Sequence, residues 1–294
     1  MPLPDPPPLG ESALPPGTFA GQTVLITGGG TGIGKGIAIE FARLGASVAI
    51  VSRKPEHQQA GVAAVEALGA RAFATGADIR HPEQIAAAFD AVEANLGPVS
   101  IVINNAAGNF TVPAEQMSAN AWRSVTQIVL DGTFFVSTEF ARRRIAAPGE
   151  GAIVNIGATY AWTGGPGAAH SAAAKAGVAN MTQTLAVEWA PDGIRVNGIA
   201  PGVFPHDDQD AHWGEGREER SRQRAASVPA GRVGQLREMG WATTFLCSPY
   251  ARYITGHTLV VDGANWLRRY GFATESFTPV RERIAQDQLS RKQS

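Results

Sequence analysis

The chain has 294 residues, of which 44% are hydrophobic and 17% are charged, a composition typical of a folded globular protein. Its formal net charge of −1 gives no electrostatic reason to expect a nucleic acid or an anionic membrane as a partner. No apolar run reaches membrane-spanning length and the N-terminus lacks a signal-peptide pattern, so we expect a cytoplasmic protein without a membrane partner. Cys247 is the only cysteine, which excludes an intrachain disulfide and argues against a Cys-ligated zinc site.

Two polar ends flank the central part of the chain. Residues 1–20 contain seven prolines and no apolar periodicity, which predicts a flexible, extended arm. Residues 271–294 are expected to form a polar C-terminal tail. Residues 21–270 carry a regular pattern and are expected to fold as one domain.

That regular pattern is an alternation of short apolar runs with amphipathic stretches. Predicted strands are Thr23–Ile26, Ser47–Val51, Ala72–Thr75, Ser100–Ile103, Ala152–Ile156, Arg195–Ile199 and Thr258–Val261. Predicted helices between them include Ile33–Leu44, Pro82–Leu96, Trp122–Ile145 and Ala172–Trp189. Repeated strand–helix–strand units need right-handed crossovers. We therefore expect a Rossmann-type, doubly wound α/β domain with a parallel sheet of about seven strands and helices on both faces.

Residues 202–231 interrupt the alternation with a polar insertion after the sixth predicted strand. In open parallel sheets, ligands bind at the carboxyl ends of the strands, so this insertion is predicted to be a substrate lid. Its residues His206, Asp207, Asp208 and His212 have no partner spacing on a rigid element, and we expect no metal site.

A glycine-rich turn joins the first predicted strand to the first predicted helix. The run from Thr27 to Gly34 reads Thr-Gly-Gly-Gly-Thr-Gly-Ile-Gly. Glycines let the backbone approach a pyrophosphate, whose charge the helix N-terminus stabilises. A turn without a ligand is the alternative, and the missing Gly-Lys-Ser/Thr ending disfavours a nucleotide triphosphatase. The residues expected to contact a dinucleotide here are Gly28, Thr31, Gly32 and Ile33.

The residues after the second predicted strand bear on the choice of dinucleotide. An acidic residue there accepts hydrogen bonds from both ribose hydroxyls of NAD. This chain has Ser52, Arg53 and Lys54 instead, a small hydroxyl and two cations that suit a 2′-phosphate. Solvated surface charge is the alternative interpretation, but the residues favour NADP(H) as the cofactor.

Four motifs together resemble the short-chain dehydrogenase/reductase family. They are the turn from Thr27 to Gly34, Asn-Asn-Ala-Ala-Gly at 104–108, Ala-Lys-Ala-Gly at 174–177, and Pro-Gly at 201–202. The resemblance extends from about Gln22 to Asn265 and implies a seven-stranded parallel sheet and a homotetramer. The residues that it assigns to the cofactor are Asp78 and Ile79 at the adenine, Asn105, Ala106 and Ala107 at the end of the fourth strand, Lys175 at the nicotinamide ribose, and Pro201 and Gly202.

Three of the four usual catalytic positions of that family are changed in this chain. Ordinary members have a tyrosine one helical turn before the lysine, whose charge lowers the phenol pKa for proton transfer to an alkoxide. This chain has Ser171 at that position, Ala158 in place of the usual serine, and Asp131 in place of an asparagine. These departures argue against an ordinary alcohol dehydrogenase or ketoreductase.

A tyrosine is present at an earlier place. Tyr160 lies just past the fifth predicted strand, fifteen residues before Lys175. The chain resembles the 2,4-dienoyl-CoA reductases, short-chain members with a tyrosine at this earlier site and a serine one turn before the lysine. The alternative is that Tyr160 only packs at the strand end.

This resemblance implies NADPH-dependent reduction of a 2,4-dienoyl-CoA to a 3-enoyl-CoA, a step in the β-oxidation of unsaturated fatty acids. Hydride added to the far end of the conjugated thioester puts charge on the thioester oxygen, which needs hydrogen-bond donors. Tyr160 is expected to stabilise this dienolate and Lys175 to position the ribose and add positive field. Ser171 is expected to hydrogen-bond near the cofactor phosphate or the substrate.

Asp131 is the residue that fits this hypothesis least well. The resembling group has an asparagine there as the second donor, whereas an ionised aspartate donates no hydrogen bond and repels an oxyanion. Asp131 is therefore protonated, turned away, or a sign of another substrate. Other functions stay open: a 2-enoyl-CoA reductase, a carbonyl reductase that uses Tyr160, or a non-catalytic NADPH-binding protein.

Overall fold

The computed structural model describes residues 3–8, 10–206 and 217–267, together with residues 281, 282, 284, 285, 288 and 289. The part of the predicted lid at 207–216 and most of the predicted C-terminal tail lie outside the described residues. None of the described helices is long and apolar enough to cross a membrane.

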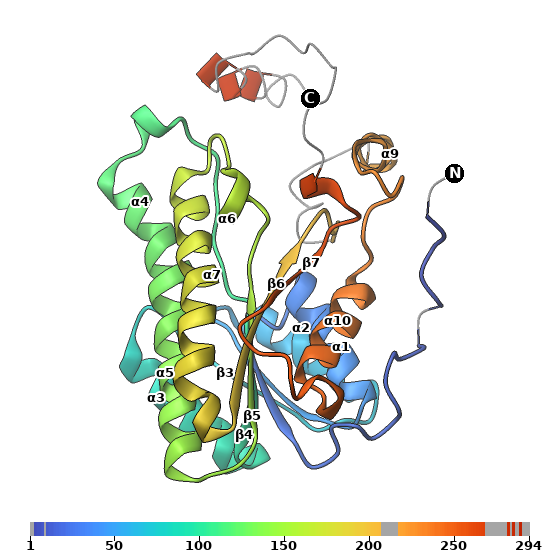
Figure 1. Cartoon of the computed structure of the whole chain (residues 1–294), viewed down its shortest axis with the longest axis vertical. Helices are drawn as coiled ribbons and strands as arrows, with labels where there is room; N and C mark the ends of the chain where they lie inside the picture. Colours follow the sequence, from blue (N-terminus) through green and yellow to red (C-terminus); the bar gives the residue numbers. More distant parts are fainter. Residues whose placement is uncertain are drawn as a thin grey trace.

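A seven-stranded parallel sheet forms the centre of the domain, with strand order β3-β2-β1-β4-β5-β6-β7 (Figure 1). Its strands are β1 (Thr23–Thr27), β2 (Ser47–Val51), β3 (Ala72–Thr75), β4 (Val99–Asn104), β5 (Gly151–Ile156), β6 (Ile194–Pro201) and β7 (Thr258–Val261). The order reverses between β1 and β4, which opens a crevice at their carboxyl ends where dinucleotides bind in such sheets. The predicted doubly wound fold is confirmed.

Helices cover both faces of the sheet (Figure 1). One layer contains α1 (Gly32–Arg43), α2 (Pro55–Glu66) and α10 (Leu236–Cys247), and the other contains α3 (Pro82–Leu96), α5 (Gly132–Ala146) and α7 (Ala169–Trp189). Outside these layers are α4 (Ala119–Thr126), which packs on α7, the one-turn helix α6 (Tyr160–Thr163) and α9 (Arg217–Ser227). Short 3₁₀ turns are η1 (Ala114–Gln116), η3 (Ala190–Asp192), η4 (Pro249–Ala251) and η5 (Asn265–Leu267).

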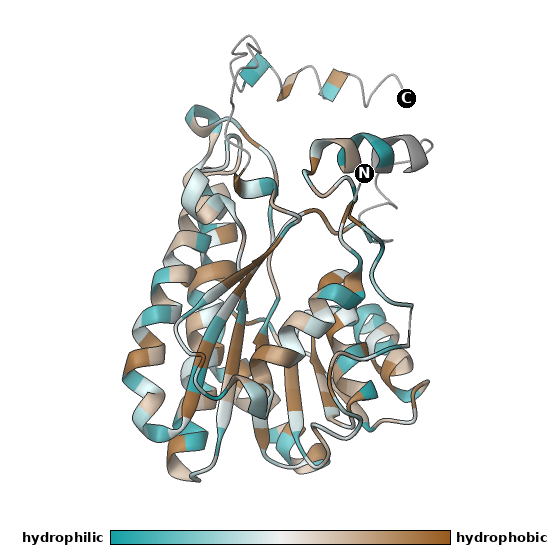
Figure 2. Cartoon of the chain, turned by 45° about the vertical axis from the view of Figure 1, so that its right-hand side comes forward, coloured by the Kyte–Doolittle hydropathy of each residue, from teal (hydrophilic) through white to brown (hydrophobic). Residues whose placement is uncertain are grey.

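Each face of the sheet has its own hydrophobic core. Phe41 of α1 and Met239 of α10 are buried in the cluster on one face, and Phe89 of α3 and Phe140 of α5 in the cluster on the other. The strands are coloured mostly as hydrophobic, and the helices around them carry both hydrophobic and hydrophilic residues (Figure 2). Burial on both sides explains why the strands read as continuous apolar runs.

The predicted helix Trp122–Ile145 is helical from Ala119 to Ala146 but contains a π-helical turn that the sequence pattern does not predict. A wider π-helical turn, η2 (Gln127–Asp131), separates α4 from α5. A Cβ at Gly132 would lie 2.7 Å from the Ile79 side chain, so the chain passes very close to the end of the β3–α3 connection at this point. Such π-turns are common at functional sites because they re-aim side chains within a helix.

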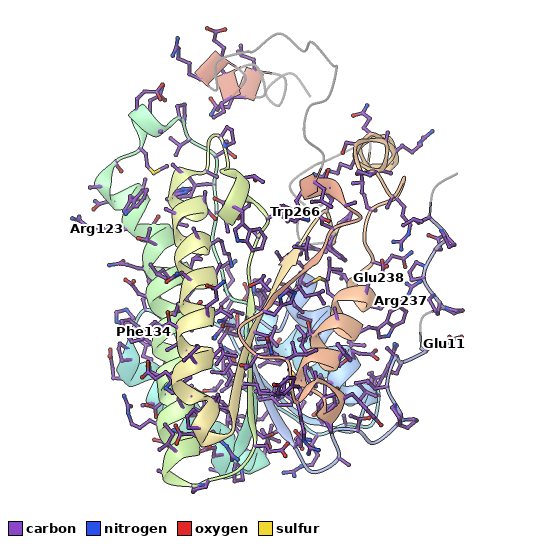
Figure 3. All side chains as sticks on the ribbon, viewed as in Figure 1. Glu11, Arg123, Phe134, Arg237, Glu238 and Trp266 are labelled. Atoms are coloured by element: carbon purple, nitrogen blue, oxygen red, sulfur yellow. The ribbon has the colours of Figure 1, made fainter. Side chains whose placement is uncertain are left out.

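The N-terminal arm runs along α10. The guanidinium of Arg237 donates hydrogen bonds to the carbonyl oxygens of Pro6 and Pro7, and Trp241 Nε1 donates to the carbonyl of Glu11 at 3.0 Å. Figure 3 shows Glu11 and Arg237 on the same side of the molecule. Proline carbonyls accept hydrogen bonds as well as any others, so a proline-rich segment can be fixed by donors from elsewhere in the chain.

Candidate active site

The glycine-rich turn begins the candidate site. Gly28 and Gly32 have φ angles of +65° and +48°, the left-handed region that favours glycine. A Cβ at Gly34 would lie 2.4 Å from the carbonyl oxygen of Gly28 and 2.5 Å from Asn105 Nδ2. The turn therefore leaves no room for side chains on its inner side. This cradle, which opens the N-terminus of α1, suits the pyrophosphate of a dinucleotide.

Asn105 connects this turn to the end of β4. Its Nδ2 donates to the carbonyl oxygens of Thr27 and Gly28, both at 3.1 Å. The backbone N–H groups of Asn105 and Ala106 both donate to the Thr27 hydroxyl at 3.0 Å. These hydrogen bonds fix the two strand ends on either side of the topological switch point.

A cleft of about 420 Å³ runs along the carboxyl ends of β1, β2 and β4. The residues that sequence analysis assigned to the cofactor and that line this cleft are Gly28, Thr31, Gly32, Ile33, Ser52, Arg53, Lys54, Asp78, Ile79, Asn105, Ala106 and Ala107. Of the others, Pro201 and Gly202 lie at the end of β6, where the Gly202 N–H donates to the carbonyl of Val261. They do not line this cleft, and neither does Lys175.

Charged side chains collect at the β2 end of the cleft. Arg53 Nη1 lies 3.8 Å from an Asp78 carboxylate oxygen. Hydrogen bonds from the Arg80 guanidinium, with a smaller contribution from the Arg53 charge, lower the pKa of Asp78 to about 2. Asp78 is therefore ionised at neutral pH and forms an ion pair with Arg53 in the cleft.

Two histidines also line the cleft and had no predicted role in cofactor binding. A Cβ at Gly30 would lie 1.9 Å from the carbonyl oxygen of His57, so the start of α2 packs directly on the glycine turn. The His206 ring lies beside Gly32 at the other side of the turn. Neither residue belongs to a sequence motif. Both reach the cleft through tertiary packing, which the sequence pattern does not reveal.

Lys175 lies at the carboxyl end of β5. Its side chain is 7% exposed, and Nζ donates a hydrogen bond to the carbonyl oxygen of Ile156. Burial disfavours the ammonium form and lowers the pKa of Lys175 to about 8. The ammonium form still predominates at pH 7, about one unit below that value.

Tyr160 and Ser171 form a hydroxyl pair beside Lys175. The Tyr160 hydroxyl lies 3.0 Å from Ser171 Oγ. Tyr160 begins α6 just past β5, and Ser171 is buried near the start of α7, one turn before Lys175. Residues four apart lie on the same helix face, so Ser171 directs the tyrosine hydroxyl towards the face that carries the lysine.

His170 stabilises the start of α7. Its Nδ1 accepts a hydrogen bond from the backbone N–H of Ser171 at 2.7 Å, and its ring is 4.6 Å from that of Phe110. Complete burial lowers the pKa of His170, and an accepting Nδ1 requires the neutral imidazole. Through Phe110 this histidine also ties α7 to the loop after β4.

Asp131 is the last residue of η2, which packs against α7. Leu130 contacts α7 closely enough that a Cβ at Gly177 would lie 3.0 Å from its Cδ1. Asp131 is half-buried, and none of the side chains that the structure describes donates a hydrogen bond to its carboxylate. The π-turn therefore brings Asp131 to the helix that carries Ser171 and Lys175, with its carboxylate unpaired among the described residues.

Two tryptophans meet at the carboxyl end of the sheet. The rings of Trp162, on α6, and Trp266, on η5, are 5.8 Å apart, and Trp162 is 46% exposed (Figure 3). The backbone N–H of Trp266 donates to Asp262 Oδ2 at 2.7 Å, and nearby Ala264 has a φ of +67°. A positive φ at a residue with a Cβ is strained and persists only where surrounding contacts fix it.

The arrangement can bind a dinucleotide along β1, β2 and β4 and can place hydroxyl donors and an ammonium group at the end of β5. Among the residues that the structure describes, no group of three His, Cys, Asp or Glu side chains could hold a metal ion. The glycine cradle fits a pyrophosphate, and Arg53 and Lys54 line the other end of the cleft. Hydrogen-bond donors near a nicotinamide suit charge that develops on a substrate oxygen.

Comparisons with known proteins agree with this geometry. A family model described as enoyl-(acyl carrier protein) reductase matches residues 28–264. A "probable 2,4-dienoyl-CoA reductase [(2E)-enoyl-CoA-producing]" of Bacillus subtilis is 39% identical over 85% of this chain and 99% of its own length. The "peroxisomal 2,4-dienoyl-CoA reductase [(3E)-enoyl-CoA-producing]" of Rattus norvegicus is 40% identical, over 86% of each chain.

A solved structure extends the likeness to three dimensions. The crystal structure of a short-chain dehydrogenase from Bacillus anthracis superposes with a TM-score of 0.77 at 42% identity, covering 85% of this chain and 99% of that one. The family model spans most of the domain, and the relatives are matched along most of their length. Membership of one family therefore accounts for the fold, the glycine turn and the lysine motif together. The chain belongs to the short-chain dehydrogenase/reductase family of NAD(P)H-dependent oxidoreductases.

Proposed function

We propose that this chain uses NADPH to reduce a 2,4-dienoyl-CoA to a 3-enoyl-CoA. The observation that carries the proposal is the hydrogen-bonded pair of Tyr160 and Ser171 beside the buried Lys175. Carbonyl reduction in this family depends on a tyrosine one turn before the lysine, which this chain lacks. The Tyr160–Ser171 pair can still donate a hydrogen bond to an oxyanion. The printed names of the Bacillus subtilis and rat relatives support an acyl-CoA substrate.

The proposed chemistry assigns one task to each residue. NADPH, when bound, would supply a hydride, and C5 of the substrate is the carbon that would accept it. The electron pair of the C4–C5 double bond shifts through the conjugated system, and negative charge collects on the thioester oxygen. Tyr160 donates a hydrogen bond to that oxygen, Ser171 orients the tyrosine hydroxyl, and Lys175 holds the ribose and adds positive charge. A proton from water then bonds to C2, which gives the 3-enoyl product.

Asp131 bears on the protonation step. A carboxylate at this place cannot stabilise the thioester oxygen, but it can hold a water molecule near the carbon that receives the proton. Protonation at C2 gives a 3-enoyl-CoA and protonation at C4 gives a 2-enoyl-CoA. The two relatives carry names for different products. The site of protonation, rather than hydride transfer, is therefore the step that Asp131 would influence.

The preference for NADPH rests on the β2 end of the cleft. Ser52, Arg53 and Lys54 place a hydroxyl and two cations where a carboxylate would select a free ribose hydroxyl. The ion pair between Arg53 and Asp78 keeps one of these cations in position without neutralising it fully, because its guanidinium has further donors.

The test compares substrates for NADPH oxidation. Trans,trans-2,4-hexadienoyl-CoA is expected to support turnover, whereas crotonyl-CoA and acetoacetyl-CoA are not, and the product is identified by mass spectrometry and NMR. Turnover with crotonyl-CoA alone would make the chain a 2-enoyl-CoA reductase, and turnover with acetoacetyl-CoA a carbonyl reductase. Tight NADPH binding with no turnover on all three would contradict the proposal.

We also propose a homotetramer, as in the family. Phe134 and Ile145 on α5 and Val187 on α7 are large apolar side chains exposed on the outer surface of one helical layer (Figure 3 labels Phe134). Large apolar side chains exposed on one helical layer suit an interface between copies of the chain. Light scattering gives the mass in solution. The cytoplasmic location expected from the sequence stays a prediction, and the rat relative is named as peroxisomal.

A further inference from the structure

His206 lies at a place in the cleft that no motif assigns. It follows the end of β6 by a few residues and lines the same cleft as Gly28, Thr31 and Gly32. The three atoms nearest to a Cβ built on Gly32 all belong to the His206 ring, at 3.0 to 3.1 Å. The imidazole therefore lies directly against the glycine that begins α1.

The negatively charged pyrophosphate of a bound dinucleotide would lie beside this glycine. The first N–H groups of α1 have no partner within the helix, and a pyrophosphate is stabilised there. The arginine and lysine described along the cleft, Arg53 and Lys54, come after β2, at the end that suits the ribose phosphate. Two side chains beside the turn can donate to a pyrophosphate, the hydroxyl of Thr31 and the imidazole of His206, and of these two only the imidazole can add a positive charge to its hydrogen bond.

We propose that His206 is a ligand of the cofactor pyrophosphate and that its protonated form binds the dinucleotide more tightly than its neutral form. An imidazolium donates from both ring nitrogens and pairs with a phosphate oxygen by a charge-assisted hydrogen bond. Protonation and binding are then linked, so cofactor affinity rises as pH falls. The inference concerns the pyrophosphate, which NADPH and NADH share, and does not depend on the acyl-CoA substrate.

Other titratable side chains near His206 also affect how cofactor binding depends on pH. On the outer side of α1, His206 also borders a groove of about 540 Å³. The titratable side chains that line this groove are Lys35, Glu40, Arg43, Glu56, His57, Arg237 and His206 itself. The next two residues in the chain, Asp207 and Asp208, lie outside the described residues. His57 lines both this groove and the cleft, as His206 does, so the two histidines must be compared.

The experiment measures equilibrium binding rather than turnover. Titration calorimetry gives the dissociation constants of NADPH, NADH and adenosine 2′-monophosphate at about pH 6 and about pH 8, for the wild type and for His206→Gln. Adenosine 2′-monophosphate occupies the ribose-phosphate end but has no pyrophosphate. NADH has no 2′-phosphate, so the titration of that group does not affect its binding. His57→Gln reports on the second histidine of the cleft, and His81→Gln, at the exposed start of α3, is the control outside it.

His206→Gln is expected to weaken NADPH and NADH about tenfold at the lower pH, to remove most of the pH dependence, and to leave adenosine 2′-monophosphate unchanged. His206→Asn, a second neutral replacement, should behave in the same way. The proposal is overturned if both variants keep the wild-type pH dependence of NADH binding. It is also overturned if adenosine 2′-monophosphate weakens to the same extent, because the loss would then not lie at the pyrophosphate.

Discussion

The two halves of the carboxyl edge of the sheet differ in what they require of the sequence. In the cofactor half, around β1, β2 and β4, backbone geometry decides the site: Gly28 and Gly34 leave space, and Asn105 holds the strand ends together. In the catalytic half, around β5 and α7, side-chain chemistry decides it, through Tyr160 and Ser171. The cofactor half tolerates few substitutions, because one added Cβ at a glycine of the turn would collide with the backbone. The catalytic half tolerates other side chains, which can give the same fold a different chemistry.

The sharpest way to break the cofactor half is Gly34→Ala. The new Cβ would meet the Gly28 carbonyl oxygen at 2.4 Å, and a backbone atom cannot turn away as a flexible side chain can. We expect NADPH affinity to fall more than a hundredfold and the free energy of unfolding to decrease by about 1–3 kcal/mol. Calorimetry and denaturant unfolding measure the two. Gly76→Ala, whose Cβ would meet only a Gln58 side-chain atom at 3.5 Å, is the matched control and should change neither.

A pH profile examines the catalytic half. The ammonium form of Lys175 is populated below its lowered pKa of about 8 and is lost above it. If that charge is needed, kcat/KM falls about tenfold per pH unit well above pH 8. Lys175→Arg, which keeps its charge throughout, should have lower activity but no such decline. A wild-type rate that stays level up to pH 10 would show that the charge is not used.

A substitution at the β2 end separates the two dinucleotides. Arg53→Ala removes one cation from the place proposed for the 2′-phosphate, so the dissociation constant of NADPH should rise about tenfold while that of NADH stays unchanged. Arg123→Ala on α4, away from the cleft, is the control (Figure 3). Equal weakening of both dinucleotides would mean that Arg53 supports the cleft without selecting the phosphate.

The smallest effect is expected at the N-terminal arm, outside both halves. Trp241→Phe removes the hydrogen bond to the Glu11 carbonyl while keeping most of the ring. We expect a loss of about 0.5–1.5 kcal/mol in the free energy of unfolding and no change in NADPH affinity. Trp122→Phe on α4, an exposed ring away from the arm, provides the comparison. Unchanged stability in Trp241→Phe would mean that the arm contacts contribute nothing measurable.

The features that sequence reasoning predicted are those set by local pattern. Buried parallel strands such as Ser47–Val51 read as unbroken apolar runs, and the turn from Thr27 to Gly34 has a spacing that few other structures need. The π-turn ending at Asp131 was not predicted because its residues keep helical periodicity on both sides. The pairing of Trp162 with Trp266 and the place of His206 depend on contacts between distant segments, which periodicity does not record.

The measurement that tests the central claim most directly is kcat/KM for trans,trans-2,4-hexadienoyl-CoA in Tyr160→Phe, with NADPH affinity measured on the same sample. The account predicts a loss of about a hundredfold to a thousandfold with unchanged NADPH binding, because only the donor to the thioester oxygen is removed. Tyr250→Phe, at an exposed tyrosine of η4, should keep full activity. Full activity in Tyr160→Phe would contradict the account and remove this tyrosine from the chemistry.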